Sequence, residues 1–178
     1  EAGGPTWAAH PSPSTPAMCR VGALARDQHI QVPNPPRAGH SPHYPRIERT
    51  HYACGRLWTS GVTLVVAAGN SGPNAGTILK PGDDPLVLTV GAYDDLRDAN
   101  PWNDTVPSWS SQGPTAAGLS KPDVVAPGRT LIATRAPGST VETQNPRSLI
   151  GSSYIKGSGT SEATAVVSGV AAEVSGCV

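Results

Sequence analysis

The sequence predicts an α/β fold with a mainly parallel sheet and flanking helices. Residues 62–68 and 86–92 form two continuous apolar runs rich in β-branched side chains. Such runs are typical of strands buried on both faces of a parallel sheet. In a third stretch, residues 161–174, alanine and valine recur at helical spacing, which predicts a helix that packs on the sheet.

Composition divides the chain near Arg56. Residues 1–56 are rich in proline, hold all five histidines and contain arginine but no lysine. Because proline removes a backbone donor and restricts the residue before it, no helical or strand period persists there. We expect this segment to be disordered or polyproline-like, and residues 57–178 to be globular.

Two other interpretations of the N-terminal segment remain open. A mistaken reading frame over residues 1–53 would explain the change in composition. Alternatively, the proline- and arginine-rich stretch at residues 33–37 could dock on an SH3- or WW-type groove, which would make the chain an interaction protein.

Charge and cysteine content exclude several classes of function. Thirteen basic and thirteen acidic residues cancel, so no electrostatic attraction to nucleic acid is expected. No run of about 18 apolar residues predicts a membrane-spanning helix, and residues 1–5 lack the basic start and apolar core of a secretory signal. Cys19, Cys54 and Cys177 are odd in number and scattered, which predicts neither a zinc site nor a disulfide framework.

The first globular elements lead to Asn70. Residues 57–61 are typical of a helix end, since Gly61 can adopt the left-handed conformation of a C-terminal cap. The predicted strand 62–68 follows directly. Asn70 then lies just beyond its carboxyl end, where open α/β sheets place their ligands.

The remaining expected elements lie between Asn70 and Ser161. Residues 93–105 form an acidic loop; acid-rich loops can bind calcium, but this one lacks a glycine-anchored series of ligands, which favours a surface loop. The other expected elements are a loop at 72–85, short strands at 123–126 and 130–135, a variable loop at 136–147, and a return through 150–155.

Ser161 closes the sequence Gly157-Ser158-Gly159-Thr160-Ser161, a tight turn that leads into the predicted helix. Backbone N–H groups and the helix dipole favour negative charge at a helix start, which suits a hydroxyl that passes through an oxyanion. A flexible loop or a helix cap is the alternative interpretation. Similarly, the Gly-Asn-Ser-Gly stretch around Asn70 could be an ordinary turn.

Four segments, in this order, resemble the subtilisin-like serine peptidases: Ala67-Ala68-Gly69-Asn70, Ser110-Ser111-Gln112-Gly113-Pro114, residues 121–128 and Gly159-Thr160-Ser161. The resemblance covers residues 57–174 and corresponds to the C-terminal part of the catalytic domain. It implies a truncated subtilisin-like sheet. It also implies that Ser161 is the nucleophile and that Asn70 donates to the oxyanion.

The same resemblance implies an aspartate and a histidine that precede Asn70. Asp27 and the five histidines, His10, His29, His40, His43 and His51, have suitable positions. None stands in an Asp-Thr/Ser-Gly or His-Gly-Thr context, so neither catalytic partner can be recognised. A further departure is Glu162, where the family often has methionine; its carboxylate can alter the local field at Ser161.

The expected function is therefore that of a serine endopeptidase, which hydrolyses peptide or protein substrates through an acyl-enzyme on Ser161. The resemblance implies no redox cofactor; many family members bind structural calcium, but no metal ligand can be named in this chain. Export is the usual route in the family. The alternative is a catalytically inactive fragment or pseudoenzyme that serves as a peptide-binding or scaffold domain.

Overall fold

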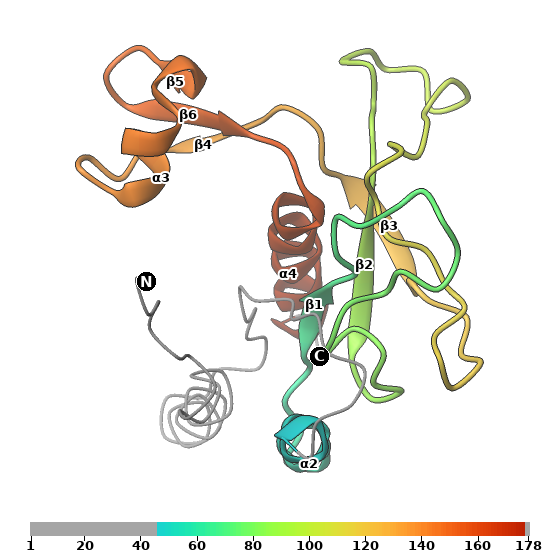
Figure 1. Ribbon diagram of the computed structural model, residues 1–178. Helices are drawn as coiled ribbons and strands as arrows, with labels where there is room; N and C mark the ends of the chain where they lie inside the picture. The colour runs from blue at the N-terminus through green and yellow to red at the C-terminus, as the bar shows by residue number, and fades with distance from the viewer. Residues whose placement is uncertain (1–45, 177–178) are drawn as a thin grey trace, which may run out of the picture.

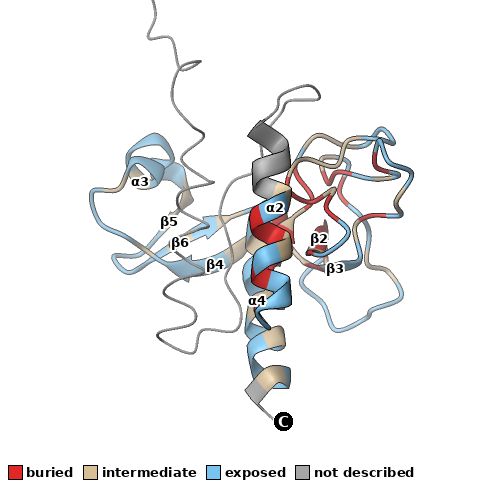
Figure 2. Ribbon diagram, turned by 90° about the horizontal axis from the view of Figure 1, so that it is seen from below, coloured by how far each residue is buried: buried red, intermediate tan, exposed pale blue. Residues whose placement is uncertain are grey.

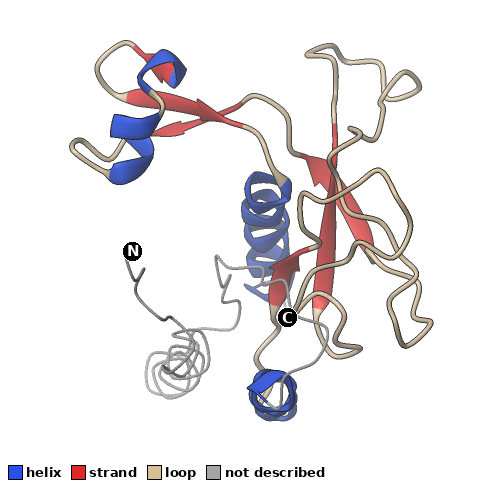
Figure 3. Ribbon diagram, in the orientation of Figure 1, coloured by secondary structure: helices blue, strands red, loops and turns tan. Residues whose placement is uncertain are grey.

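A three-stranded parallel sheet forms the centre of the protein. The computed structural model describes residues 46–176, with side chains for residues 51–175. The strands β1 (Val65–Ala67), β2 (Leu88–Tyr93) and β3 (Val124–Pro127) are hydrogen-bonded in that order. Val65 is paired with Leu88 and Val90 with Val124. The predicted α/β fold with a parallel sheet is confirmed (Figure 3).

The C-terminal helix α4 (Thr160–Gly176) packs against all three strands. Ala163 has no exposed surface and joins a cluster of buried side chains from the sheet: Val65, Val90, Ala92 and Ala126. The small side chain of alanine lets the helix backbone approach the sheet closely at this point. The start of α4 is thereby fixed against the strands.

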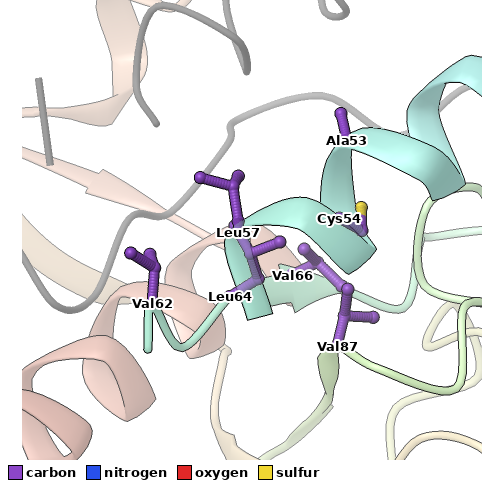
Figure 4. Close-up of a cluster of buried hydrophobic side chains, with 7 residues drawn as sticks. All are labelled: Ala53, Cys54, Leu57, Val62, Leu64, Val66 and Val87. Atoms are coloured by element: carbon purple, nitrogen blue, oxygen red, sulfur yellow. The ribbon is translucent and has the colours of Figure 1, made fainter. Parts of the chain in front are cut away.

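The helix α2 (Arg46–Thr59) packs at the end of the sheet where β1 begins (Figure 1). Its buried side chains and those of the neighbouring strands form a second apolar cluster, which consists of Ala53, Cys54, Leu57, Val62, Leu64, Val66 and Val87 (Figure 4). Because successive strand residues face opposite sides, Val65 packs toward α4, whereas Leu64 and Val66 pack toward α2. This strand is therefore buried on both faces, as its apolar run predicts.

The extent of α2 differs from the sequence-based expectation. The helix ends at Thr59 and Gly61 has a φ of +81°, which confirms the predicted helix end. It begins at Arg46, however, so residues 46–56 are helical rather than disordered. Burial of Ala53 and Cys54 against the strands explains the difference. Residues 1–45, to which the rest of that expectation applies, lie outside the described residues.

A second, antiparallel sheet forms an arm that projects from the core (Figure 1). Its strands β4 (Leu131–Thr134), β5 (Leu149–Ile150) and β6 (Tyr154–Gly157) have the order β4-β6-β5. None of residues 131–157 is buried (Figure 2). The strand expected at 130–135 therefore belongs to the arm, not to the parallel sheet.

The loop expected at residues 136–147 contains two short helices, α3 (Thr140–Gln144) and η2 (Pro146–Ser148). Ser139 caps α3 by accepting a hydrogen bond from the backbone of Glu142. An ion pair between Arg135 and Glu142 ties α3 to β4. Among the described helices, none combines the length and apolarity needed to cross a membrane.

Candidate active site

The loop after β1 meets the start of α4 through Thr160. Its backbone N–H donates to Asn70 Oδ1 at 2.9 Å, and its hydroxyl donates to the same oxygen at 3.0 Å. The hydroxyl also accepts a hydrogen bond from the backbone of Gly69 at 3.1 Å. Thr160 is almost completely buried. It therefore joins two segments that are separated by 90 residues in the sequence.

These contacts orient the side-chain amide of Asn70. Oδ1 accepts both hydrogen bonds from Thr160, and Nδ2 lies near the preceding residue, Gly159. A β-carbon placed on Gly159 would lie 3.1 Å from Asn70 Nδ2 and 3.7 Å from the backbone nitrogen of Ser161. Both nitrogens therefore lie close to the same residue. Two N–H donors that converge on one point can stabilise an oxygen that gains negative charge.

Ser161 is the second residue of α4 and is exposed. Its hydroxyl is accessible to a ligand, whereas its neighbours Thr160 and Ala163 are buried. The preceding turn is held against the sheet, since the Gly159 N–H donates to the Gly128 oxygen at 2.9 Å. A β-carbon on Gly128 would lie 2.5 Å from the β-carbon of Ala92. Glycine at this position therefore permits the close approach.

The segment at residues 110–114 supports the Asn70 loop. The backbone N–H of Ser111 donates to the Gly69 oxygen at 2.9 Å, and the Ser111 hydroxyl accepts from the backbone of Ser71 at 3.0 Å. Gly69 has a φ of +110°, a conformation that favours glycine. The segments at residues 67–70 and 110–114, which are separate in the sequence, are therefore in contact in the structure.

The segment at residues 121–128 anchors β3. Lys121 is buried; its Nζ donates to the Val87 oxygen at 2.8 Å and pairs with Asp123 Oδ2 at 2.6 Å. The same carboxylate oxygen accepts from the backbone of Thr89 at 2.7 Å. The buried charge of Lys121 is thus compensated, and β3 is held beside β2.

His51 is the one histidine within residues 46–176, and it does not lie at Ser161. It projects from α2 and its Nε2 is 3.2 Å from Asp83 Oδ1; Lys80 pairs with the other oxygen of that carboxylate. Asp83 precedes β2, whereas Ser161 follows the carboxyl ends of the strands, and α2 lies at the opposite end of the sheet (Figure 1). Asp27 and the other four histidines lie outside the described residues.

Asp94 and Asp98, in the acidic loop after β2, both have hydrogen-bond or ion-pair partners. Asp94 pairs with Arg129 at 2.8 Å and also accepts from the backbone of Leu96. Hydrogen bonds from the Asn103 side chain and then from the Asn100 backbone lower the pKa of the Asp98 carboxyl. Within the described part of the chain, no three side chains of His, Cys, Asp or Glu are grouped as metal ligands would be.

Sequence reasoning did not identify Thr160 as a residue of the site. Its role depends on hydrogen bonds to Gly69 and Asn70, which no local pattern predicts. The one available signal was its place in the motif, directly before Ser161. Asn70 and Ser161, which were expected at the site, lie on either side of it.

An α/β fold that brings a serine at a helix start beside an asparagine amide resembles the nucleophile and oxyanion donor of serine hydrolases. The model of the subtilase family, peptidase S8, matches residues 12–176. The chain therefore belongs to the subtilase family. The match includes residues before 57, where the sequence itself suggested no resemblance.

Two curated relatives support this assignment. The chain is 48% identical over 115 residues to the serine protease AprX of Bacillus subtilis (strain 168), a stretch that is 65% of this chain and 26% of AprX. It is 37% identical over 124 residues to the subtilisin-like protease SBT6.1 of Arabidopsis thaliana, covering 65% of this chain and 10% of that protein. The chain thus spans only part of the length of both relatives.

Solved structures show the same fold. Sphericase superposes with a TM-score of 0.65 at 25% identity, over 90% of this chain and 47% of its own. The S41 psychrophilic protease gives a TM-score of 0.66 at 24% identity, over 90% of this chain and 48% of its own. The chain therefore corresponds to about half of each of these two structures.

Proposed function

We propose that this chain carries the nucleophile and the oxyanion hole of a subtilisin-like serine endopeptidase. Ser161 Oγ attacks the carbonyl carbon of a peptide bond and forms an acyl-enzyme, which water then hydrolyses. The Asn70 side-chain amide and the Ser161 backbone N–H donate to the oxyanion. One observation carries this proposal: the nitrogens of both groups lie close to Gly159, two residues before Ser161.

Acyl transfer also requires a base that accepts the proton of Ser161. His51 does not fit this role because it is paired with Asp83 in front of β2. The base would come from residues outside 46–176, and the relatives contain much chain that has no counterpart here. The names of the two relatives, a serine protease and a subtilisin-like protease, favour a peptide or protein as substrate.

The second candidate function is peptide binding without catalysis. It is favoured by the lack of a histidine near Ser161 among the described residues. In such a pseudoenzyme, Asn70 and Thr160 would serve only to join β1 to α4. The two candidates differ in one testable property, the reactivity of the Ser161 hydroxyl.

A fluorophosphonate probe, which reacts with activated serines, tests the proposal. We expect the full chain to be labelled at Ser161, with loss of labelling in Ser161→Ala and no change in Ser153→Ala, an exposed serine on the arm. Asn70→Ala should lower the labelling rate by roughly 100- to 1000-fold, the known contribution of the equivalent donor in subtilisin. Absence of labelling, or labelling that persists in Ser161→Ala, would instead favour the non-catalytic candidate.

A further inference from the structure

The side chain of Glu162, which follows the proposed nucleophile, folds back over the glycine turn. A β-carbon placed on Gly157 would lie 2.6 Å from Glu162 Oε1, and one on Gly159 would lie 2.7 Å from Oε2. Both carboxylate oxygens therefore lie against the backbone that leads into Ser161. Glycine at these two positions leaves the room that the carboxylate occupies.

The carboxylate lies near the two proposed oxyanion donors. The β-carbon position on Gly159 that lies 2.7 Å from Glu162 Oε2 is also 3.1 Å from Asn70 Nδ2 and 3.7 Å from the Ser161 nitrogen. Glu162 is half-buried, so water screens its charge only in part. A negative charge thus lies near the groups that would donate to the oxyanion.

Helix capping does not account for this position. A glutamate at the third residue of a helix often accepts a hydrogen bond from the backbone N–H of the residue before the helix. Here the N–H of Gly159 donates to the Gly128 oxygen at 2.9 Å instead. Within the described residues, the Glu162 carboxylate accepts no hydrogen bond from another group.

Nor does a cation neutralise Glu162 within the described part of the chain. The charged and titratable groups on the neighbouring elements are Lys156 on β6, Arg129 after β3, and Tyr93 and Asp94 at the end of β2. Lys156 is exposed, and Arg129 is paired with Asp94 at 2.8 Å. The negative charge of Glu162 is therefore not cancelled locally.

We propose that Glu162 slows attack by Ser161 by holding a negative charge near the two oxyanion donors. This inference rests on the proposed function. The carboxylate opposes the negative charge that develops on the substrate oxygen. The site is therefore partly inhibited by a residue of its own helix.

The first experiment tests the electrostatic coupling without requiring turnover. Amide signals of the Asn70 side chain and the Ser161 backbone are compared by ¹H–¹⁵N NMR in the full chain and in its variants at about pH 8. We expect both signals to shift in Glu162→Gln, because the nearby charge is removed. Glu173→Gln, a matched change in the exposed last part of α4, should leave both signals at their wild-type positions.

The second experiment measures the rate at which the fluorophosphonate probe labels Ser161. At about pH 8 we expect Glu162→Gln to react on the order of 10- to 100-fold faster than the wild type, because a partly screened like charge is removed. Glu162→Asp, which keeps the charge, and Glu173→Gln should both react at about the wild-type rate.

Two results would overturn the inference. One is a set of Asn70 and Ser161 amide shifts that do not depend on Glu162. The other is a Glu162→Gln variant that is labelled no faster than the wild type at about pH 8. Failure of every variant to react counts against the proposed function, and the comparison of the amide signals then decides the role of Glu162 by itself.

Discussion

At the scale of single residues, Thr160 determines how the candidate site is assembled. One hydroxyl accepts from Gly69 and donates to Asn70, and both contacts lie in the interior. The orientation of the Asn70 amide follows from this arrangement, since its oxygen faces Thr160. In the proposed mechanism Thr160 does not contact the substrate, but it positions Asn70, which does.

Thr160→Val removes the hydroxyl and nearly preserves the shape of the side chain. We expect a loss of about 1–3 kcal/mol in the free energy of unfolding, because the buried N–H of Gly69 loses its acceptor. We also expect roughly 10-fold slower labelling of Ser161, since Asn70 is less well held. Urea unfolding and labelling kinetics measure the two effects. Thr160→Ser, which keeps the hydroxyl, should resemble the wild type; equal labelling rates for the valine and serine variants would contradict the positioning role.

The thiol of Cys54 gives a prediction about stability at high pH. Burial, followed by the nearby charge of Asp84, raises its pKa from 9.0 to about 12. Below pH 9.0 the thiol is neutral in both the folded and the unfolded state, so its stabilising contribution is complete. Between pH 9.0 and about 12 only the unfolded state loses the proton. Folding is therefore expected to weaken by up to about 1.4 kcal/mol per pH unit.

Unfolding midpoints in urea at about pH 8 and about pH 10 would measure this effect. The matched variant is Cys54→Ala, which lacks the thiol and should lose less stability over the same interval. Equal losses in the two proteins would show that the Cys54 thiol does not carry the predicted dependence.

At the scale of elements, α2 supports the strand that leads to Asn70. Leu57 is 4% exposed within the cluster formed by α2, β1 and the start of β2. Leu57→Ala is expected to lower the free energy of unfolding by about 2–5 kcal/mol, because it removes buried methyl groups and leaves a cavity. Trp58 on the same helix is 48% exposed, so Trp58→Ala should change stability by about 0.5 kcal/mol or less. Similar losses in the two variants, measured by urea unfolding, would contradict this packing.

The arm shows which kind of element the sequence predicts poorly. Residues 131–134 were expected to form a strand, and they do. Their partners, residues 154–157, are paired antiparallel to them across a long intervening connection, and such non-local pairing has no signature in a short strand. The helix α3 has only five residues, which is too few for a helical period to be recognised.

At the scale of the whole molecule, the sequence predicted the sheet and the positions of Asn70 and Ser161 because their signals are local. Apolar runs indicate the strands, and glycine turns indicate where the chain leaves them. Residues 46–56 were assigned wrongly because the adjacent proline-rich composition concealed a narrow apolar face formed by Ala53, Cys54 and Leu57. Thr160 was missed because its partners are 90 and 91 residues away. The roles of Asn70 and Ser161 stay predictions until labelling tests them.

The separation between Asn70 and Thr160 also bears on when the candidate site can form as the chain is made. The strands that form the sheet precede α4 in the chain, and a protein emerges from the ribosome beginning at its N-terminus. Until α4 has emerged and docked, Asn70 has no hydroxyl to orient it and Ser161 has no donor beside it. Newly made, unfolded copies would therefore lack the arrangement on which the proposed catalysis depends, at the stage when neighbouring unfolded chains are most exposed.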